Sequence, residues 1–359
     1  MTFAFYKKYK EEKRILKLIT FAVPSYNSQD YMRHCIDTLL AGGDEVEIVI
    51  VNDGSKDDTG AIADEYAAKY PDIVVPVHQA NGGHGSGVNA GMDRAKGLYY
   101  KVVDSDDWLD TDALKTVLGT IRAHVQAGEG ADLYICNFVY EHVSDGTSYV
   151  SHYRKKMPVG RFFGWDEVKS FTKWEMLLMH SLIYRTEALR ASGIRLPEHT
   201  FYVEKLFSYQ PLPCMKKLYY VDVDLYRYFI GRSDQSVNVD NMTKRYEQQI
   251  RVMRLMTDAY TYDYIRSQKK GLRKYMFHAL GAIMMNTIFF TAGGKDNRET
   301  RKEKLDELWR HIKERDKKLY KKLRYRSLPA IISWMPFGIR GAVSAAGYKF
   351  LCKFVKLGQ

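Results

Sequence analysis

The sequence predicts an α/β protein with a mostly parallel, doubly wound sheet, followed by a basic helical region. Short apolar runs alternate with amphipathic stretches through the first half of the chain, and each apolar run ends in a polar loop. Strands and helices that alternate at this length favour a parallel sheet covered by helices. Because the charge changes sign near residue 240, we expect one domain over residues 1–240 and a second over residues 241–359.

The first strand–loop–helix unit begins the predicted sheet. Residues 17–23 form a short apolar run that breaks into a loop at Pro24-Ser25-Tyr26-Asn27, which is typical of a buried strand. Ser28 stands where a helix N-cap is expected, and apolar residues recur at helical spacing from Met32 to Leu40. This unit is therefore a strand, a loop and an amphipathic helix.

Two further units and a fourth strand repeat this order. Pro71 marks the end of the second helix, because the residue before a proline disfavours helical backbone. The expected strands are residues 47–51, 73–77 and 98–103. The first of them leads through Asn52-Asp53-Gly54-Ser55 into a helix at residues 58–70. The second leads through a glycine-rich loop at residues 78–87 into a helix that ends near residue 96.

Three carboxylates follow the fourth strand within four residues, at Asp104-Ser105-Asp106-Asp107. Like charges this close are unfavourable unless a cation meets them, and hard oxygen ligands suit Mg²⁺ or Mn²⁺ better than zinc. Asp104 and Asp106 are therefore candidate ligands for a metal-bound diphosphate. The alternative is a solvated acidic turn in which Asp110 caps a helix at residues 111–126.

The loops after the four strands fall at one edge of the predicted sheet. Ligands of doubly wound sheets bind beyond the carboxyl ends of the strands. Tyr26, Asp53, the glycine-rich loop and the acidic cluster Asp104–Asp107 all lie at these ends. We therefore predict a single site built from four loops.

The segment Gly85–Ala90 supports a competing interpretation. It reads G-x-G-x-x-A, follows a strand, opens a helix and precedes an acidic residue by about twenty positions. However, it follows the third strand instead of the first, and three carboxylates are present where one ribose needs only one. An NAD-dependent oxidoreductase is kept as an alternative; the sequence contains no P-loop.

The second half of the first domain has a less regular pattern. His180 stands in an apolar setting, which favours a core histidine over a metal ligand. We expect strands at residues 132–139 and 218–228, a polar excursion compatible with a hairpin at 141–164, and mixed, mainly helical structure at 165–189.

Two residues of this half are candidates for chemistry. Glu204 is the acid nearest the middle of an aromatic and apolar helix start, where a carboxylate can be tuned for proton abstraction. Pairing with Lys205 or Lys217 is the ordinary explanation for it. Arg232, in a Gly/Ser-containing loop, suits a phosphate contact, and a surface turn explains it equally well.

The back of the chain is strongly basic. Residues 241–359 hold 27 Lys and Arg against 10 Asp and Glu, a balance of +17, whereas residues 1–240 hold 28 against 33, a balance of −5. Such a region suits a polyanion or an anionic membrane surface. Because the sequence has no recognisable nucleic-acid module, we expect no nucleic-acid partner.

Residues 241–323 are expected to form three helices, the middle one at residues 279–292. That run of about fourteen residues is too short to cross a bilayer. Residues 339–356 gather apolar side chains on one arc of a helical wheel and lysines opposite. This layout fits an interfacial helix on anionic lipid, and packing against the chain's own helices explains the apolar arc equally well. A homodimer surface is a further option for the helical region.

The cysteines and the N-terminus indicate a compartment. The four cysteines form no C-x-x-C pair, and residues 1–18 are charged and lack a long apolar core. We therefore expect reduced thiols and a cytoplasmic protein without a signal peptide, held peripherally at the inner face of the cell membrane by its basic region.

The ordered motifs at the predicted edge resemble those of inverting glycosyltransferases of family 2, which have the GT-A fold. The resemblance covers about residues 17–238 and implies transfer of a sugar, with inversion and with Mg²⁺ or Mn²⁺, from a nucleotide-diphosphate donor, for which we expect a UDP-sugar. The implied acceptor is a hydroxyl of a cell-surface glycan, a teichoic-type polymer or a lipid-linked molecule. The motifs are Pro24-Ser25-Tyr26-Asn27, Asn52-Asp53-Gly54-Ser55, the Asn81 loop, Asp104-Ser105-Asp106-Asp107 and Glu204.

The resemblance also implies roles for single positions. Tyr26, with Pro24 and Asn27, falls where the family flanks the nucleotide base, and Asp53 falls where a carboxylate accepts from the base imide. Asp104 and Asp106 match the pair that meets the ribose side and the metal, and Glu204 falls on the catalytic base. The loop beside the diphosphate and sugar is matched by Asn81, Gly83, Asn89 and Gly91.

Two departures from the family pattern bear on function. Val88 occupies a position where many relatives have Arg, so a diphosphate contact must come from elsewhere, with His84 and Arg232 as candidates. Val203 replaces the first acid of an acidic pair whose second member is Glu204. These departures keep open a non-catalytic scaffold with the same fold.

Overall fold

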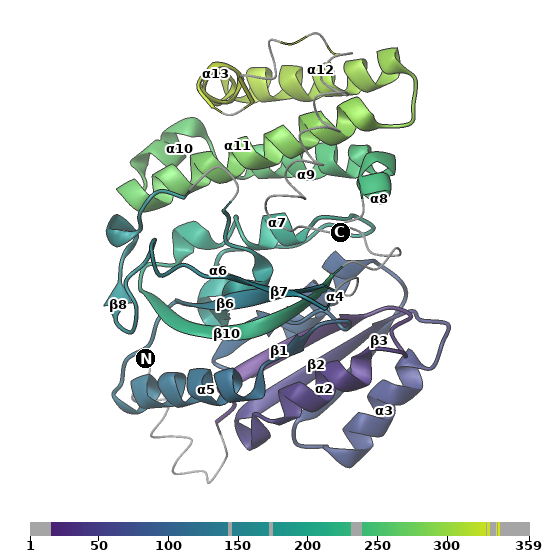
Figure 1. Cartoon of the computed structure of the whole chain (residues 1–359), viewed down its shortest axis with the longest axis vertical. Helices are drawn as coiled ribbons and strands as arrows, with labels where there is room; N and C mark the ends of the chain where they lie inside the picture. The colour runs from purple at the N-terminus through teal and green to yellow at the C-terminus, as the bar shows by residue number, and fades with distance from the viewer. Residues whose placement is uncertain are drawn as a thin grey trace.

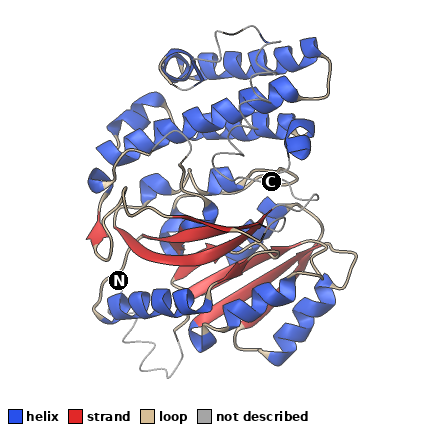
Figure 2. Ribbon diagram, in the orientation of Figure 1, coloured by secondary structure: helices blue, strands red, loops and turns tan. Residues whose placement is uncertain are grey.

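A computed structural model of the chain describes residues 16–142, 146–171, 175–230, 239–327, 329–330, 335 and 337. The predicted α/β architecture is confirmed. The described residues form a ten-stranded sheet with the order β3-β2-β1-β4-β9-β6-β10-β5, to which β7 and β8 add by pairing with β6 and β10. Helices cover this sheet, and a helical region follows it (Figure 1 and Figure 2).

The first four strands form the parallel part of the sheet. Most of their residues are buried, which explains why they are near-continuous apolar runs in the sequence. Their predicted bounds are confirmed to within two residues. β1 (Ile19–Ser25) lies between β2 (Val46–Asp53) and β4 (Tyr99–Val102), and β3 (Val74–Gln79) pairs with β2.

The helices after these strands are α2 (Met32–Leu40), α3 (Thr59–Lys69), α4 (His84–Arg94) and α5 (Thr111–Gln126). Asp110 caps α5 as predicted, because its side chain accepts from the Ala113 N–H at 3.0 Å. The prediction that Ser28 caps α2 is wrong, since α2 has no side-chain cap. The Ser28 hydroxyl instead lies 2.7 Å from the Ser105 hydroxyl, which ties the first loop to the acidic loop.

A strand that the sequence did not predict lies in the middle of the sheet. β9 (Leu182–Arg185) runs antiparallel between β4 and β6 (Leu133–His142). The expectation of mainly helical structure at 165–189 is therefore wrong over this segment. Four residues are too few to display a period of two, so the pairing partners decide the conformation here.

The strands after β6 curve toward the acidic loop. β6 continues into an antiparallel hairpin with β7 (Ser148–Ser151), as expected, and pairs in parallel with β10 (Leu218–Ile230). Register shifts between Tyr220 and Tyr226 mark irregularities in β10, and such bulges bend a strand. The last part of β10 then pairs with β5 (Trp108–Leu109), which directly follows the acidic loop.

The helical region differs in detail from the prediction of three helices. Its middle helix, α11, spans 24 residues instead of about fourteen, and by length and composition it is apolar enough to cross a membrane. Within the described residues, 72% of its most apolar window is buried, and it contacts α9 and α12 on either side, as expected for a core helix. The helices are α8 (Val239–Lys244), α9 (Tyr246–Ala259), α10 (Tyr262–Ser267), α11 (Lys270–Gly293), α12 (Arg298–Arg315) and α13 (Lys317–Tyr325).

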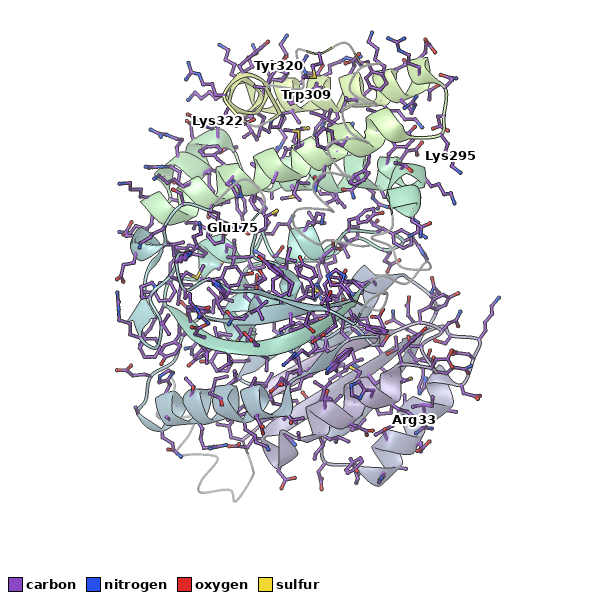
Figure 3. All side chains as sticks on the ribbon, in the orientation of Figure 1. Arg33, Glu175, Lys295, Trp309, Tyr320 and Lys322 are labelled. Atoms are coloured by element: carbon purple, nitrogen blue, oxygen red, sulfur yellow. The ribbon has the colours of Figure 1, made fainter. Side chains whose placement is uncertain are left out.

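One hydrophobic core joins the sheet and the helical region. A continuous cluster of buried side chains runs from Leu18 in front of β1 to Leu323 in α13. At the far end of the molecule, the rings of Trp309 and Tyr320 meet 5.9 Å apart and close the contact between α12 and α13 (Figure 3). The domain division at residue 240 stays a prediction, and the predicted interfacial helix at 339–356 lies outside the described residues.

Candidate active site

The loops after β1 and β2 are bound to each other. The N–H of Asn27 donates to the Ser55 hydroxyl at 3.0 Å, and the Asn27 side-chain oxygen accepts from the Lys56 N–H at 2.9 Å. Asn27 has a φ of 48°, a left-handed conformation that asparagine tolerates. Tyr26 beside it is 50% exposed, and Pro24 lies inside β1. Tyr26 is therefore available to a ligand, whereas Asn27 fixes the loops.

Asp53 holds the glycine-rich loop in place. Its buried carboxylate accepts from the N–H groups of Gly82 at 2.9 Å and Gly83 at 2.7 Å, and from the Gln79 side chain at 2.7 Å. Asn81 donates its side-chain N–H to the Asp53 carbonyl at 2.9 Å. The carboxylate thus satisfies loop amides at the end of β3, and its contact with a nucleotide base stays a prediction.

His84 brings a positive charge to the acidic loop. It opens α4, directly after Gly83 with its φ of 83°, and its Nε2 lies 2.8 Å from Asp104 Oδ1. Burial acts to lower the pKa of His84, but Asp104, with smaller contributions from Glu204 and Asp106, raises that pKa above its ordinary value. Burial likewise acts to raise the pKa of Asp104, but His84, with smaller contributions from nearby groups, lowers it below its usual range. The two groups form an imidazolium–carboxylate pair.

Asp107 is fixed by the end of β10. It is fully buried, with Oδ2 accepting from the Tyr226 hydroxyl at 2.5 Å and Oδ1 from the Phe229 N–H at 2.9 Å. The same Tyr226 oxygen accepts from the Asp104 N–H at 3.1 Å. Burial raises the pKa of Asp107 well above its ordinary value, and the charges of Asp106 and Asp104 add to this. Tyr226 therefore links two of the three carboxylate residues.

His180 and Lys101 lie beside this loop. The His180 ring packs 4.5 Å from the ring of Tyr226 and 4.4 Å from that of Tyr228, measured between centroids. The His180 carbonyl accepts from the buried Lys101 ammonium at 2.5 Å. Burial lowers the pKa of His180 to about 4 and that of Lys101 to about 8. His180 is therefore a neutral imidazole at neutral pH.

Asp104, Asp107 and His180 together form a candidate cation site. Each offers one ligand atom, and these atoms lie within 4.8 Å of one another. His180 Nδ1 is buried without a hydrogen-bond partner among the described residues, which fits a ligand role, and carboxylate oxygens suit Mg²⁺ or Mn²⁺. Asp106, half-buried in the same loop, is not a member of this group, so its role as a ligand stays a prediction.

Glu204 lies near the acidic loop. It opens α7 (Glu204–Phe207), and its Oε1 is 3.1 Å from the Lys205 ammonium, so the ordinary pairing is present. Its charge also acts on His84 and His180, in each case as a smaller influence than burial and Asp104. The structure thus brings the predicted base toward the predicted donor edge.

The segment that leads to Glu204 is positioned by α4 and the glycine-rich loop. Asn89 donates to the Leu196 carbonyl at 2.8 Å and accepts from the Leu196 N–H at 3.0 Å. The Gly82 carbonyl accepts from the His199 N–H at 2.7 Å. Asn89 is therefore a positioning residue in this structure, and its direct contact with a donor stays a prediction. Arg232 lies outside the described residues.

The G-x-G-x-x-A match has a packing explanation. Its glycines lie inside α4, not in a turn before it. A Cβ at Gly85 would meet the Pro197 carbonyl oxygen at 2.6 Å, and one at Gly87 would meet the Pro24 side chain at 2.9 Å. The glycines thus allow close approach of the helix to its neighbours, and the dinucleotide interpretation is wrong for this motif.

Sequence reasoning missed several partners of the acidic loop. The apolar setting of His180 favours a core position, and the strand predicted at residues 218–228 gives Tyr226 and Tyr228 no role at the site. Their alternation in the sequence, which puts both on one face of β10, was the available signal.

The curled, mostly parallel sheet and the helical region after it match the fold of GT-A glycosyltransferase structures. Residues 20–181 match the family model for glycosyl transferase family 2. This segment, a little under half of the chain, is similar to glycosyltransferase family 2.

Curated relatives with glycosyltransferase names match the chain as well. The chain is 30% identical to EpsH of Bacillus subtilis over an alignment of 245 residues. This alignment covers 65% of this chain and 64% of EpsH. It is 28% identical over 228 residues to glycosyltransferase GlyA of Streptococcus pneumoniae, covering 61% of this chain and 31% of GlyA. The chain thus spans less than two thirds of either relative.

A solved structure of similar length matches the whole fold. The crystal structure of S. aureus TarS 1-349 in complex with UDP-GlcNAc has a TM-score of 0.60 and 20% sequence identity, and covers 92% of this chain and 91% of that chain. At this identity the match supports the fold, including the helical region.

Proposed function

We propose that this protein is an inverting, metal-dependent glycosyltransferase that transfers a sugar from a UDP-sugar to a hydroxyl of a glycan. The observation that carries the proposal is the ion pair of His84 with Asp104 in the acidic loop, at the edge where the parallel strands end, with Glu204 close enough for its charge to act on His84. Binding of UDP-GlcNAc by TarS, which shares the fold, supports uridine as the donor nucleotide.

The chemistry assigned to the chain is a single displacement at the anomeric carbon. Glu204 accepts the proton of the acceptor hydroxyl as that oxygen attacks the carbon, and the bond to the nucleotide diphosphate breaks on the opposite face. One displacement inverts the configuration. His84, held in the ion pair with Asp104, is a cation placed to meet the diphosphate where relatives use an arginine.

Asp104 with Asp107 and His180, or Asp104 with Asp106 as the sequence predicts, would hold Mg²⁺ or Mn²⁺. Such a cation, when bound, neutralises charge on a leaving diphosphate. Asp107 accepts two hydrogen bonds and Asp104 pairs with His84, so each carboxylate keeps lone pairs for a cation, and the His180 nitrogen has no partner among the described residues.

The acceptor and the location are part of the proposal. A cell-surface glycan, a teichoic-type polymer or a lipid-linked molecule would be met at the inner face of the cell membrane, where the basic region suits anionic lipid. Helix α13 supports this assignment, since residues 317–326 carry six Lys and Arg and no acid.

The experiment is a measurement of UDP release from a panel of UDP-sugars, with Mn²⁺ or Mg²⁺ and then with EDTA. We expect release with one sugar, its loss in EDTA, and a fall of about 100-fold or more in Glu204→Gln. Glu198→Gln is the matched control, because Glu198 is an exposed acid on the same segment.

Two results would contradict the proposal. Equal rates of UDP release in Glu204→Gln and Glu198→Gln would show that Glu204 is not the catalytic base. No release from UDP-, dTDP- or GDP-sugars, by a folded protein that binds UDP, would leave the non-catalytic scaffold as the better description.

A further inference from the structure

Three tyrosines stand in one row across the outer strands of the sheet. Tyr140 of β6 is opposite Tyr149 of β7 in the antiparallel pair and level with Tyr228 of β10 in the parallel pair. The three strands lie side by side (Figure 1). The ring centroids are 6.4 Å apart for Tyr140 and Tyr149, and 5.7 Å apart for Tyr140 and Tyr228. We call these three residues the tyrosine row.

The tyrosine row leads from the surface to the candidate active site. Its outer member, Tyr149, is 47% exposed, and the other two are half-buried. Beyond its inner member the His180 ring follows at 4.4 Å, and His180 in turn packs on Tyr226, which holds the acidic loop. The row therefore connects an open strand to the residues that hold Asp104 and Asp107.

The polar atoms of the row lack protein partners. Among the described residues, no hydrogen bond is found for the hydroxyls of Tyr140 and Tyr228, and neither hydroxyl is a buried unpaired atom. Aromatic pairs across strands stabilise many sheets, which accounts for the rings. The two hydroxyls stay available to a ligand, because each can both donate and accept a hydrogen bond.

We propose that the tyrosine row is the acceptor-binding surface and that it takes an uncharged oligosaccharide. Sugar rings would stack on the flat aromatic faces, while sugar hydroxyls would bond to the hydroxyls of Tyr140 and Tyr228. A saccharide suits this combination, since it presents both C–H faces and hydroxyl groups. The role as acceptor surface rests on the proposed function.

Charge decides between the acceptor classes. The row carries aromatic rings and hydroxyls and no cation, so it offers nothing to neutralise the repeated phosphates of a teichoic-type polymer. His84 and Lys101, which lie near its inner end, are already bound to Asp104 and to the His180 carbonyl. An anionic polymer would therefore find no cation along the row itself, whereas a neutral glycan needs none.

The test measures binding of saccharides and of UDP by the full chain. Cellohexaose and chitohexaose are the neutral probes and poly(glycerol phosphate) is the anionic one, each followed by saturation-transfer NMR, with UDP affinity from calorimetry. We expect a neutral hexasaccharide to bind and Tyr149→Ala to weaken that binding by about 3- to 10-fold, the loss of one stacked aromatic contact. The affinity for UDP should stay within about twofold of wild type.

Matched variants separate the row from general effects on folding. Tyr264→Ala removes a tyrosine of similar exposure, also stacked on a neighbouring tyrosine, from α10, and should leave saccharide binding unchanged. Tyr140→Phe and Tyr228→Phe keep the rings and remove only the hydroxyls, so each should weaken saccharide binding without loss of stability.

Each other outcome overturns the inference. It fails if neither hexasaccharide binds, if only poly(glycerol phosphate) binds, or if the row variants bind the saccharide as tightly as wild type. Saccharide binding that depends on the row, in a protein that turns over no donor, would overturn the proposed function and with it the acceptor role. If the protein turns over a donor and the row variants bind the saccharide as tightly as wild type, the proposed function stands and only the acceptor role of the tyrosine row is rejected.

Discussion

Removing one hydroxyl, in Tyr226→Phe, should loosen the acidic loop. This oxygen accepts from the Asp104 N–H and donates to Asp107, and the residue is fully buried. The ring itself is retained, so the change leaves no cavity and keeps the contact with His180. Any effect therefore reports the two hydrogen bonds.

The magnitude follows from those two bonds. Each contributes about 1 kcal/mol net, and a buried carboxyl oxygen left without its partner adds about 1–2 kcal/mol. The free energy of unfolding should therefore fall by about 2–4 kcal/mol. Because the loop positions Asp104, half-maximal UDP release should also need a higher Mn²⁺ concentration.

Urea denaturation followed by circular dichroism measures the first effect, and a Mn²⁺ titration of UDP release measures the second. Tyr134→Phe is the control, since its hydroxyl bonds to His124 and lies away from the acidic loop. A loss below about 0.5 kcal/mol in Tyr226→Phe would show that these bonds do not hold the loop, and the account of Asp104 and Asp107 would be wrong.

Three further predictions concern packing, pH and loop position. Gly271→Ala should strongly lower the free energy of unfolding, because its Cβ would lie 1.8 Å from the Trp165 carbonyl oxygen. The Cβ of Gly119→Ala would meet nothing within 4 Å, so this change should stabilise its helix by about 0.5–1 kcal/mol. Urea denaturation of both variants measures the two effects. Burial lowers the pKa of His124 below its ordinary value of 6.5, so the unfolded chain binds more protons than the folded chain at lower pH. The free energy of unfolding should therefore fall from pH 7 to pH 5, and it should fall less steeply in His124→Phe. Equal slopes for wild type and His124→Phe would contradict this prediction. Asn89→Ala should speed hydrogen exchange at the Leu196 and His199 amides, as seen by mass spectrometry, and unchanged exchange would remove the positioning role.

Sequence patterns were sufficient for the parallel half of the sheet. β1, β2 and β4 are buried on both faces, so their apolar runs are continuous, and the loops after them carry the turn and capping residues that mark their ends. Asp110 was recognised as a cap for the same reason, because its partner is only three residues away. Local chemistry of this kind is readable from the chain alone.

The other half of the site depends on contacts between distant residues. Tyr226 meets Asp107 across 119 positions in the sequence and Asn89 meets Leu196 across 107, and no local pattern reports such pairs. β9 has only four residues, too few to show a strand period, so the sequence does not predict it or the position of the neighbouring His180. The family resemblance predicts ligand contacts for Asp53 and Asn89, which stay predictions, and the structure adds that their polar atoms hold neighbouring loops.

The burial of α11 depends in part on a helix that is synthesised after it. The helix has 24 residues, its most apolar window of 18 residues has a mean hydropathy of 1.3, and it contacts α9, which precedes it, and α12, which follows it. A nascent chain that ends before residue 315 therefore exposes a segment with the length and apolarity of a membrane span. Until α12 has emerged, the same residues that complete the core are a target for chaperones, for aggregation or for insertion into a bilayer.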